Sequence, residues 1–160
     1  MVIDFICRIP IPIRDFTAAP NLIVIRSFDV NKPGEDAKNL KGGVAGGTIL
    51  KGVLRVGDEV EIRPGIVRKD QKSGNMTWQS IITRVVSLQA DENNLMYAVP
   101  GGLIGVGLKV DPYLTRSDRL VGSIIGYPNQ MPQVVIEIEV QFYLLRRLLG
   151  VKNESGSSSQ

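Results

Sequence analysis

One stretch, Gly42 to Gly65 (GGVAGGTILKGVLRVGDEVEIRPG), constrains the fold more than any other part of the chain. Its second half alternates as Glu59-Val60-Glu61-Ile62, and alternation with period two places one set of side chains in a core and the other in water. The turns Lys51-Gly52 and Val56-Gly57-Asp58 divide the stretch. The glycines mark places where the chain kinks or another backbone approaches closely. The pattern predicts strand, tight turn and strand.

Similar signals recur along the 160 residues. They predict further strands over Leu22–Val30, Trp78–Gln89, Leu103–Val110 and Asp118–Gly126, with exposed loops over Asn31–Lys41 and Arg63–Thr77. Strands at this spacing, joined by short turns, are typical of a closed Greek-key-like β-barrel. The predicted fold class is therefore all-β. Trp78 and Tyr97 are expected to contribute to the barrel core, and the alternative is that they stack on nucleic-acid bases.

Both ends of the chain differ from this pattern. Met1–Ile13 has apolar residues that suit one face of a short helix, ended by Pro10 and Pro12. Gln133–Leu145 alternates strongly and predicts an extra strand beyond the barrel. Because this strand has no partner among the predicted barrel strands, its exposed edge is expected to recruit another chain and give a swapped or strand-paired homodimer. Asn153–Gln160 (NESGSSSQ) is expected to be a flexible tail.

The composition argues against catalysis by this chain. There is no histidine, which excludes Ser-His-Asp and Cys-His catalysis and most zinc sites. No glycine-rich loop ends in Gly-Lys-Ser/Thr, so nucleotide binding is not expected. The carboxylates that remain for acid–base chemistry, at Asp91-Glu92, Asp111 and Asp118, sit in turns, where they commonly cap the backbone. We expect no enzyme activity, no metal site and no cofactor in this chain.

Charge and hydropathy bound the partners and the location. A net charge of +3 permits contact with RNA phosphates without requiring it. The single Cys7 suits a reducing compartment. No signal peptide is evident, and no apolar run approaches the roughly 20 residues that span a bilayer. The sequence therefore predicts a cytoplasmic protein with no membrane contact.

Five blocks carry a resemblance to a known family: IRSFDVNKPG (Ile25–Gly34), LKGGVAGGTILKGVL (Leu40–Leu54), EIRPGIV (Glu61–Val67), PGGLIGVGLKVDP (Pro100–Pro112) and LLRRLLGV (Leu144–Val151). The chain resembles the second domain of translational GTPases such as elongation factor Tu. More closely, it is similar to the gamma subunit of the eukaryotic and archaeal initiation factor two, which carries initiator methionyl-tRNA. The selenocysteine-specific elongation factor is a less similar alternative.

The resemblance implies a division of the chain. Residues 1–19 would end a preceding GTPase domain and its linker, 20–127 would form the barrel of domain 2, 128–152 would hold a linker and the first strand of domain 3, and 153–160 would be the tail. GTP and magnesium would bind to the missing domain. The implied partners are initiator methionyl-tRNA, the alpha subunit, the GTPase and third domains of the same subunit and, indirectly, the small ribosomal subunit.

The resemblance also implies a pocket for the terminal adenosine of the tRNA acceptor end. The positions that match it are Val30, Gly43, Val44, Ala45, Gly46, Gly107 and Leu108. Gln89 or a neighbour stands where elongation factor Tu has a carboxylate near the adenine. A second interpretation of the glycines is that barrel geometry alone requires them.

Seven cations form a second candidate surface, for RNA phosphates or for the alpha subunit: Lys32, Lys38, Lys41, Arg63, Arg68, Lys69 and Lys72. The alternative is that these residues belong to solvated loops and bind no partner.

For the chain as a whole, the alternative function is a structural barrel that bridges protein subunits without contacting RNA.

Overall fold

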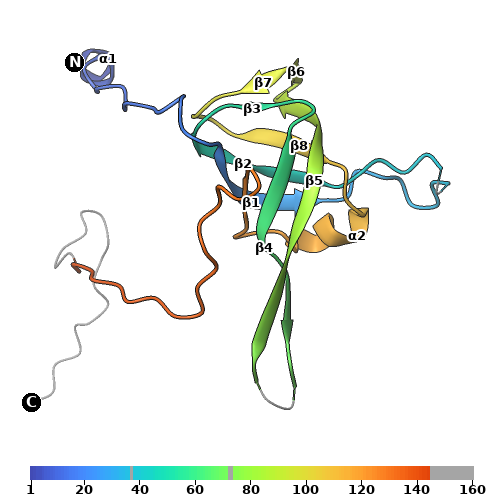
Figure 1. The fold of residues 1–160 in the computed structure, drawn as a ribbon. Helices are drawn as coiled ribbons and strands as arrows, with labels where there is room; N and C mark the ends of the chain where they lie inside the picture. Colours follow the sequence, from blue (N-terminus) through green and yellow to red (C-terminus); the bar gives the residue numbers. More distant parts are fainter. Residues whose placement is uncertain (37, 72–73, 145–160) are drawn as a thin grey trace, which may run out of the picture.

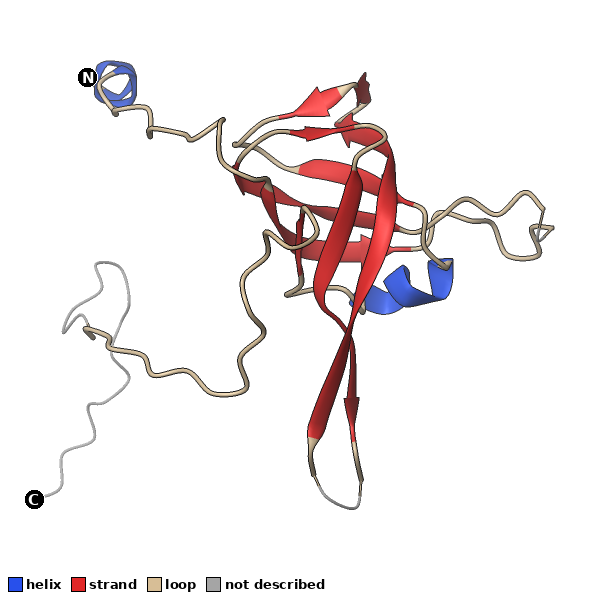
Figure 2. Cartoon of the chain, viewed as in Figure 1, coloured by secondary structure: helices blue, strands red, loops and turns tan. Residues whose placement is uncertain are grey.

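The structure is a computed structural model that describes residues 1–36, 38–71 and 74–144 (Figure 1). Six antiparallel strands close into a barrel, in the order β4-β9-β1-β2-β8-β5 with β5 returning to β4, and β6 adds to the edge of β5. The barrel strands are β1 (Asn21–Phe28), β2 (Val44–Lys51), β4 (Glu59–Lys69), β5 (Met76–Ala90), β8 (Ile104–Leu108) and β9 (Ile124–Gly126). β6 (Asn93–Leu95) is an added strand, and β3 (Leu54–Arg55) pairs with β7 (Tyr97–Ala98). The predicted all-β barrel is confirmed (Figure 2).

The core explains the alternation seen in the sequence. Every second residue of β2 and β8 points inward, and β1 begins in the same way with Leu22 and Val24, which are each 1% exposed. A register shift in β1 after Val24 then places Ser27, and not Arg26, in the interior. Aliphatic side chains from all around the barrel meet in one cluster, which includes Ala45, Ile49, Val60, Ile62, Val85, Leu88, Val106, Leu108 and Ile125. Burial of this apolar surface is the main stabilisation of the fold.

The predicted loop over Arg63–Thr77 is wrong. β4 runs on to Lys69 and pairs with β5, which begins at Met76, so the two strands form a long hairpin that projects from the barrel (Figure 1). The register is irregular between Ile62 and Ile66, because Pro64 and Gly65 interrupt the alternation there. Gly65 has φ +76°, which side chains other than glycine rarely adopt. Because the alternation of apolar and polar residues stops at Pro64-Gly65, it does not predict that β4 continues to Lys69.

The strand predicted over Asp118–Gly126 is also mostly wrong. A short helix, α2 (Pro112–Thr115), precedes this region, and a 3-10 turn, η1 (Arg116–Asp118), overlaps it at Asp118. Residues 119–122 form turns, and β9 begins only at Ile124. The Asp111 side chain accepts a hydrogen bond from the Tyr113 amide and caps α2, with Pro112 in its first turn. The Asp-Pro pair is therefore a helix start as well as a turn signal.

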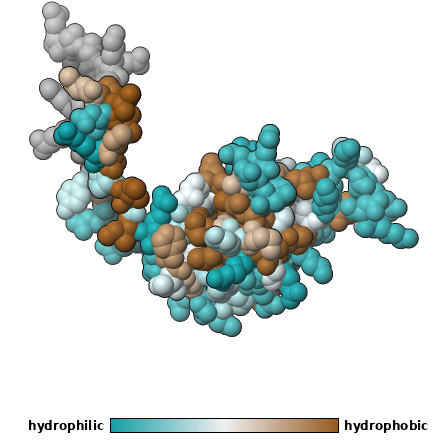
Figure 3. All heavy atoms as spheres, turned by 90° about the horizontal axis from the view of Figure 1, so that it is seen from above, coloured by the Kyte–Doolittle hydropathy of each residue, from teal (hydrophilic) through white to brown (hydrophobic). Residues whose placement is uncertain are grey.

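The ends of the described chain leave the barrel (Figure 1). The predicted N-terminal helix is present as α1 (Val2–Cys7). The strand predicted over Gln133–Leu145 is not formed within residues 133–144, and Leu145 lies outside the described residues. None of the described strands pairs with this segment, so its backbone groups have no partner in a sheet of the described chain. Its apolar side chains are exposed, such as Ile136 at 84%, and Figure 3 shows hydrophobic residues along the parts of the chain that extend from the barrel.

The described residues contain no helix that is long and apolar enough to cross a membrane.

Candidate functional site

An open groove of about 390 Å³ lies over strands β1, β2 and β8, and we call it the β2–β8 groove. Its walls are apolar side chains and its rim carries a few polar ones. The lining residues are Ile25, Arg26, Phe28, Val30, Val44, Gly46, Gly47, Gln89, Asp91, Leu103, Ile104 and Gly105.

The floor of the β2–β8 groove is a pair of glycines. Gly46 of β2 is the direct cross-strand partner of Gly105 of β8. A Cβ atom added to Gly46 would come no closer than 3.7 Å to any neighbour, and one added to Gly105 no closer than 3.8 Å. Both distances are ordinary van der Waals contacts, so packing does not require glycine at either position. The absence of two side chains leaves room for a flat group to approach the backbone.

Three of the seven positions expected in a pocket line this groove. Val30 and Val44 stand on its wall and Gly46 on its floor. Val30 is 45% exposed, so its side chain is free to contact a bound group.

The other four positions lie elsewhere. Ala45 and Leu108 are buried in the barrel core, because the alternation of β2 and β8 turns them inward. Gly107 pairs with Val44, and a Cβ there would collide with Ser87. At Gly43 a Cβ would collide with Thr115. Barrel packing therefore accounts for Gly43, because Thr115 is fully buried, as the second interpretation held. At Gly107 the contact is with the hydroxyl of the exposed Ser87, which can rotate away.

Sequence reasoning missed several groove residues. Phe28, Leu103 and Asp91 line the groove because β1, β5 and β8 converge there. Gln89 is present as expected, opposite Gly105 in the β5–β8 register, and its amide donates to Asn94 at 2.9 Å. The only signal was strand alternation, which puts Phe28 on the same face as Val30, whereas the cross-strand neighbours depend on a register that no single strand encodes.

Arg63 is not a free cation. Its guanidinium donates from Nε to Glu61 Oε1 at 2.8 Å and from Nη2 to Glu61 Oε2 at 3.1 Å. It also donates to the carbonyls of Met131 and Pro132 at 3.3 and 3.0 Å. The hydrogen bonds from Arg63 lower the pKa of the buried Glu61 carboxyl below its ordinary value. Arg63 thus fixes the segment that leaves the barrel, and the expectation that it contacts phosphate or a subunit finds no support in its geometry.

The remaining predicted cations fall into two groups. Arg68 and Lys69 are exposed on the projecting hairpin, while Lys72 lies outside the described residues. Lys32, Lys38 and Lys41 are exposed on the loop between β1 and β2.

Asn31 holds the two ends of this loop together. Its side chain donates to the Lys41 carbonyl at 2.8 Å and accepts from the Lys41 amide at 2.6 Å. These two hydrogen bonds fix the ends of the loop, while its lysine side chains are exposed to solvent.

Trp78 and Tyr97 are not core residues, contrary to expectation. Trp78 is 44% exposed on the hairpin and Tyr97 is 61% exposed on β7. Trp78 stands opposite Val67 on the projecting hairpin, where β4 and β5 pair only with each other among the described strands.

Two of the candidate acid–base carboxylates, Asp118 and Asp111, have structural partners. Asp118 accepts from the Ser27 amide at 2.8 Å and from Arg26 Nε at 3.1 Å, and the Ser27 hydrogen bond is the main cause of its lowered pKa. Asp111 caps α2. Within the described residues, no cluster of three or more His, Cys, Asp or Glu side chains could hold a metal ion.

This geometry can be compared with known proteins. A family model described as Elongation factor Tu domain 2 matches residues 42–126, which include five of the six barrel strands and the whole groove floor. The chain belongs to this family. It is 59% identical over 157 residues to the eukaryotic translation initiation factor 2 subunit 3 of Drosophila melanogaster and 60% identical over 153 residues to the subunit gamma of that factor from Schizosaccharomyces pombe.

Both alignments cover 95% of this chain. The chain spans only about a third of these relatives, 33% and 34% of their lengths. A solved structure of translation elongation factor SelB from Methanococcus maripaludis, in complex with the GTP analogue GppNHp, matches with a TM-score of 0.56 and 22% identity. That match covers 80% of this chain and 23% of the SelB chain, and it supports the barrel fold alone.

Proposed function

We propose that this barrel serves translation initiation as a non-catalytic binding module of a gamma-type subunit. It helps to bind the acceptor end of initiator methionyl-tRNA and it docks the alpha subunit. The identity of about 60% to initiation factor 2 gamma subunits over nearly the whole chain supports the assignment to initiation. GTP and magnesium would be held by a GTPase domain of the longer subunit, and the protein would act in the cytoplasm on the path to the small ribosomal subunit.

The observation that carries the RNA-binding half is the glycine floor of the β2–β8 groove. Gly46 and Gly105 are not required by packing, and they lie between apolar walls that include Phe28, Val30 and Val44. An adenine ring has two apolar faces and a polar edge, so it can lie against the aliphatic and aromatic walls. Gln89 and Asp91 at the rim can accept or donate hydrogen bonds at that edge.

The affinity of this barrel for the tRNA end should be lower than that of the whole subunit. The methionylated end would be bound jointly by this barrel and the GTPase domain, so the barrel alone should bind it weakly. A near-native affinity of the 160-residue chain for the tRNA would contradict this proposal.

A specific observation favours a second candidate function, a structural barrel that only bridges protein subunits. Only three of the seven expected positions line the β2–β8 groove, and Arg63 is engaged within the fold. Salt dependence separates the two functions. With two or three phosphate contacts, RNA affinity should fall roughly tenfold between about 50 and 200 mM salt, whereas apolar docking of a protein should change little.

The test is a pair of filling substitutions, Gly46→Val and Gly105→Val, titrated with a methionylated RNA minihelix that carries the tRNA acceptor stem. A Cβ atom meets only ordinary contacts at both positions, and valine suits a strand, so the barrel should stay folded. Each variant should lose most of the minihelix binding, while Ile82→Val, at a 63% exposed site outside the groove, should not. Equal binding by all three would refute the groove as the RNA site.

A further inference from the structure

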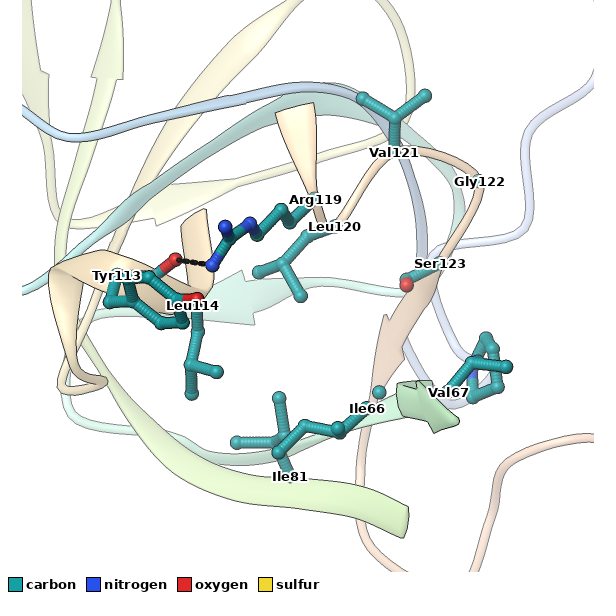
Figure 4. Close-up of a pocket in the computed structure, with 12 residues that line it drawn as sticks. Ile66, Val67, Ile81, Tyr113, Leu114, Arg119, Leu120, Val121, Gly122 and Ser123 are labelled. Atoms are coloured by element: carbon teal, nitrogen blue, oxygen red, sulfur yellow. Dashed lines mark hydrogen bonds between the residues drawn. The ribbon is translucent and has the colours of Figure 1, made fainter. Parts of the chain in front are cut away.

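A second groove, of about 380 Å³, lies at the base of the β4–β5 hairpin, and we call it the hairpin groove (Figure 4). Ile66 and Ile81 line it from the hairpin, while Leu114 and Leu120 line it from the segment that runs from α2 to β9. Arg119 also lines it, and none of the lining residues is acidic. No residue is shared with the β2–β8 groove, so the two are separate sites.

The topology leaves one edge of the hairpin open beside this groove. β4 pairs with β9 only over Glu61–Arg63, and beyond that point β5 is its sole partner among the described strands. The other edge of β4 beyond Arg63 therefore has no neighbouring strand in the described chain, and Pro64–Val67 border the groove. An unpaired edge beside an apolar cavity is a ready site for an added strand.

Residues 133–144 of the same chain have the pattern of a strand but no partner in a sheet. Ile136, Ile138 and Val140 are 84%, 71% and 63% exposed, and Glu137 and Glu139 stand between them. This alternation is typical of a strand that buries one face. None of the described strands pairs with it. One chain thus holds both an open strand edge beside an apolar groove and an unpaired amphipathic segment.

The charges of the two elements are complementary. Residues 133–144 contain two carboxylates, Glu137 and Glu139, and no lysine or arginine. In the β4–β5 register, Ile66 and Arg68 lie on one face of the hairpin and Lys69 lies on the other. An added strand whose aliphatic side chains enter the groove beside Ile66 turns its carboxylates to the face of Lys69. Lys69 is exposed and is in no ion pair within the described chain.

The segment of one chain is directed away from the hairpin groove of that chain. Arg63 donates to the carbonyls of Met131 and Pro132 at 3.3 and 3.0 Å, which fixes the point where the segment begins. From there the segment leaves the barrel on the side of the hairpin opposite to α2, whereas the groove lies between the hairpin and α2 (Figure 1). A second copy can present its segment to this groove, and two-fold symmetry lets each copy fill the groove of the other.

We propose that the hairpin groove receives residues 133–144 of a second copy of this chain, in a reciprocal dimer. The segment pairs with the edge of β4 beyond Arg63. Its aliphatic side chains enter the groove beside Ile66 and Leu114, and its carboxylates lie on the face of Lys69. The dimer contact shares no lining residue with the β2–β8 groove, so it does not rest on the proposed function.

The test is sedimentation equilibrium of the 160-residue chain and of four variants that all replace isoleucine by aspartate. Ile66→Asp places a charge in the groove and Ile138→Asp places one in the segment. The matched controls, Ile82→Asp and Ile11→Asp, make the same change at sites outside both that are 63% and 84% exposed. A loss of about tenfold at one site becomes roughly a hundredfold in a dimer whose two equivalent sites both carry the change. The controls should dimerise within about twofold of the unaltered chain.

Mixing the two variants distinguishes a lost contact from a lost fold. Isotope-labelled Ile138→Asp keeps an intact groove, and unlabelled Ile66→Asp keeps an intact segment. Adding the second to the first should shift the amide NMR signals of Ile66, Leu114 and Gly122 in the labelled chain. Adding unlabelled Ile138→Asp instead, which lacks an intact segment, should leave these signals where they are.

Three results would overturn the inference. The first is an unaltered chain that stays monomeric at about 1 mM. The second is dimerisation of Ile66→Asp or Ile138→Asp as tight as that of the controls, which would place the contact outside the groove or outside the segment. The third is a groove signal that changes in Ile138→Asp but is independent of concentration in the unaltered chain, because the segment would then dock within its own chain.

Discussion

Replacement of Arg63 by alanine should destabilise the barrel more than the loss of any exposed charge. The Glu61 side chain is 6% exposed, and Arg63 is both its ion-pair partner and its main hydrogen-bond donor. Breaking a buried ion pair by removing one partner costs about 3–5 kcal/mol, because the other charge stays buried. We expect the lower end, about 3 kcal/mol, since Arg63 is 20% exposed and Ser80 and Asn129 still donate to Glu61.

The effect should depend on pH with a definite sign. The folded-state pKa of Glu61 is below its ordinary value of 4.5, so the stabilisation is fully present above that pH and is lost as the pH falls through the folded-state pKa. The difference in unfolding free energy between the unaltered chain and Arg63→Ala should therefore be largest near neutral pH and should shrink in acid.

Urea denaturation between neutral pH and about pH 3 measures this difference, and thermal melting should show a drop of roughly 10–20 °C at neutral pH. Arg68→Ala, at an exposed position on the hairpin, is the matched control and should have little effect. The paired change Glu61→Leu with Arg63→Met should recover most of the stability, because no charge is then left buried. The reasoning fails if Arg63→Ala costs no more than Arg68→Ala, or if its cost is independent of pH.

Three further predictions follow from local contacts. Gly43→Ala should destabilise the barrel by about 1–3 kcal/mol because its Cβ collides with the buried Thr115, whereas Gly46→Ala should be neutral or slightly stabilising, and urea denaturation would compare the two. Tyr127→Phe should cost about 1 kcal/mol, since the hydroxyl donates to Asp58 Oδ2 at 2.8 Å, and a cost near zero in thermal melting would argue against that hydrogen bond. Sedimentation at high concentration should reveal a swapped or strand-paired dimer through the exposed residues 133–144, and a clean monomer with this segment disordered would contradict it.

The barrel could be predicted from the sequence because its signals are local. Alternation in Glu59–Ile62 and in Leu103–Val110 reports which side chains face the core, and the structure buries Val60, Ile62 and Val106 as that pattern requires. The hairpin beyond Ile62 was missed because Pro64-Gly65 breaks the alternation while cross-strand pairing with β5 continues it. Pairing is a long-range property, and periodicity does not record it.

The groove was predicted less completely for the same reason. Resemblance pointed to strand β2, so it found Val44 and Gly46 but also included Ala45, which alternation turns into the core. Asp91 follows the end of β5 and Leu103 precedes β8, and the strand register that brings them to the groove is defined only by the folded barrel. From the sequence alone, a charged residue such as Arg63 is predicted to be an exposed cation. Only the structure shows that it is paired with Glu61 and bound to the carbonyls beyond the barrel.

The most direct test of the central claim is to map, by amide NMR shifts, where this chain binds the methionylated minihelix, with and without its terminal adenosine. We predict weak binding whose shifts centre on Gly46, Gly105 and Val30, and loss of those shifts when the adenosine is removed. Identical shift patterns for the two RNAs, or shifts confined to the exposed lysines, would contradict the claim that the β2–β8 groove receives the end of the tRNA.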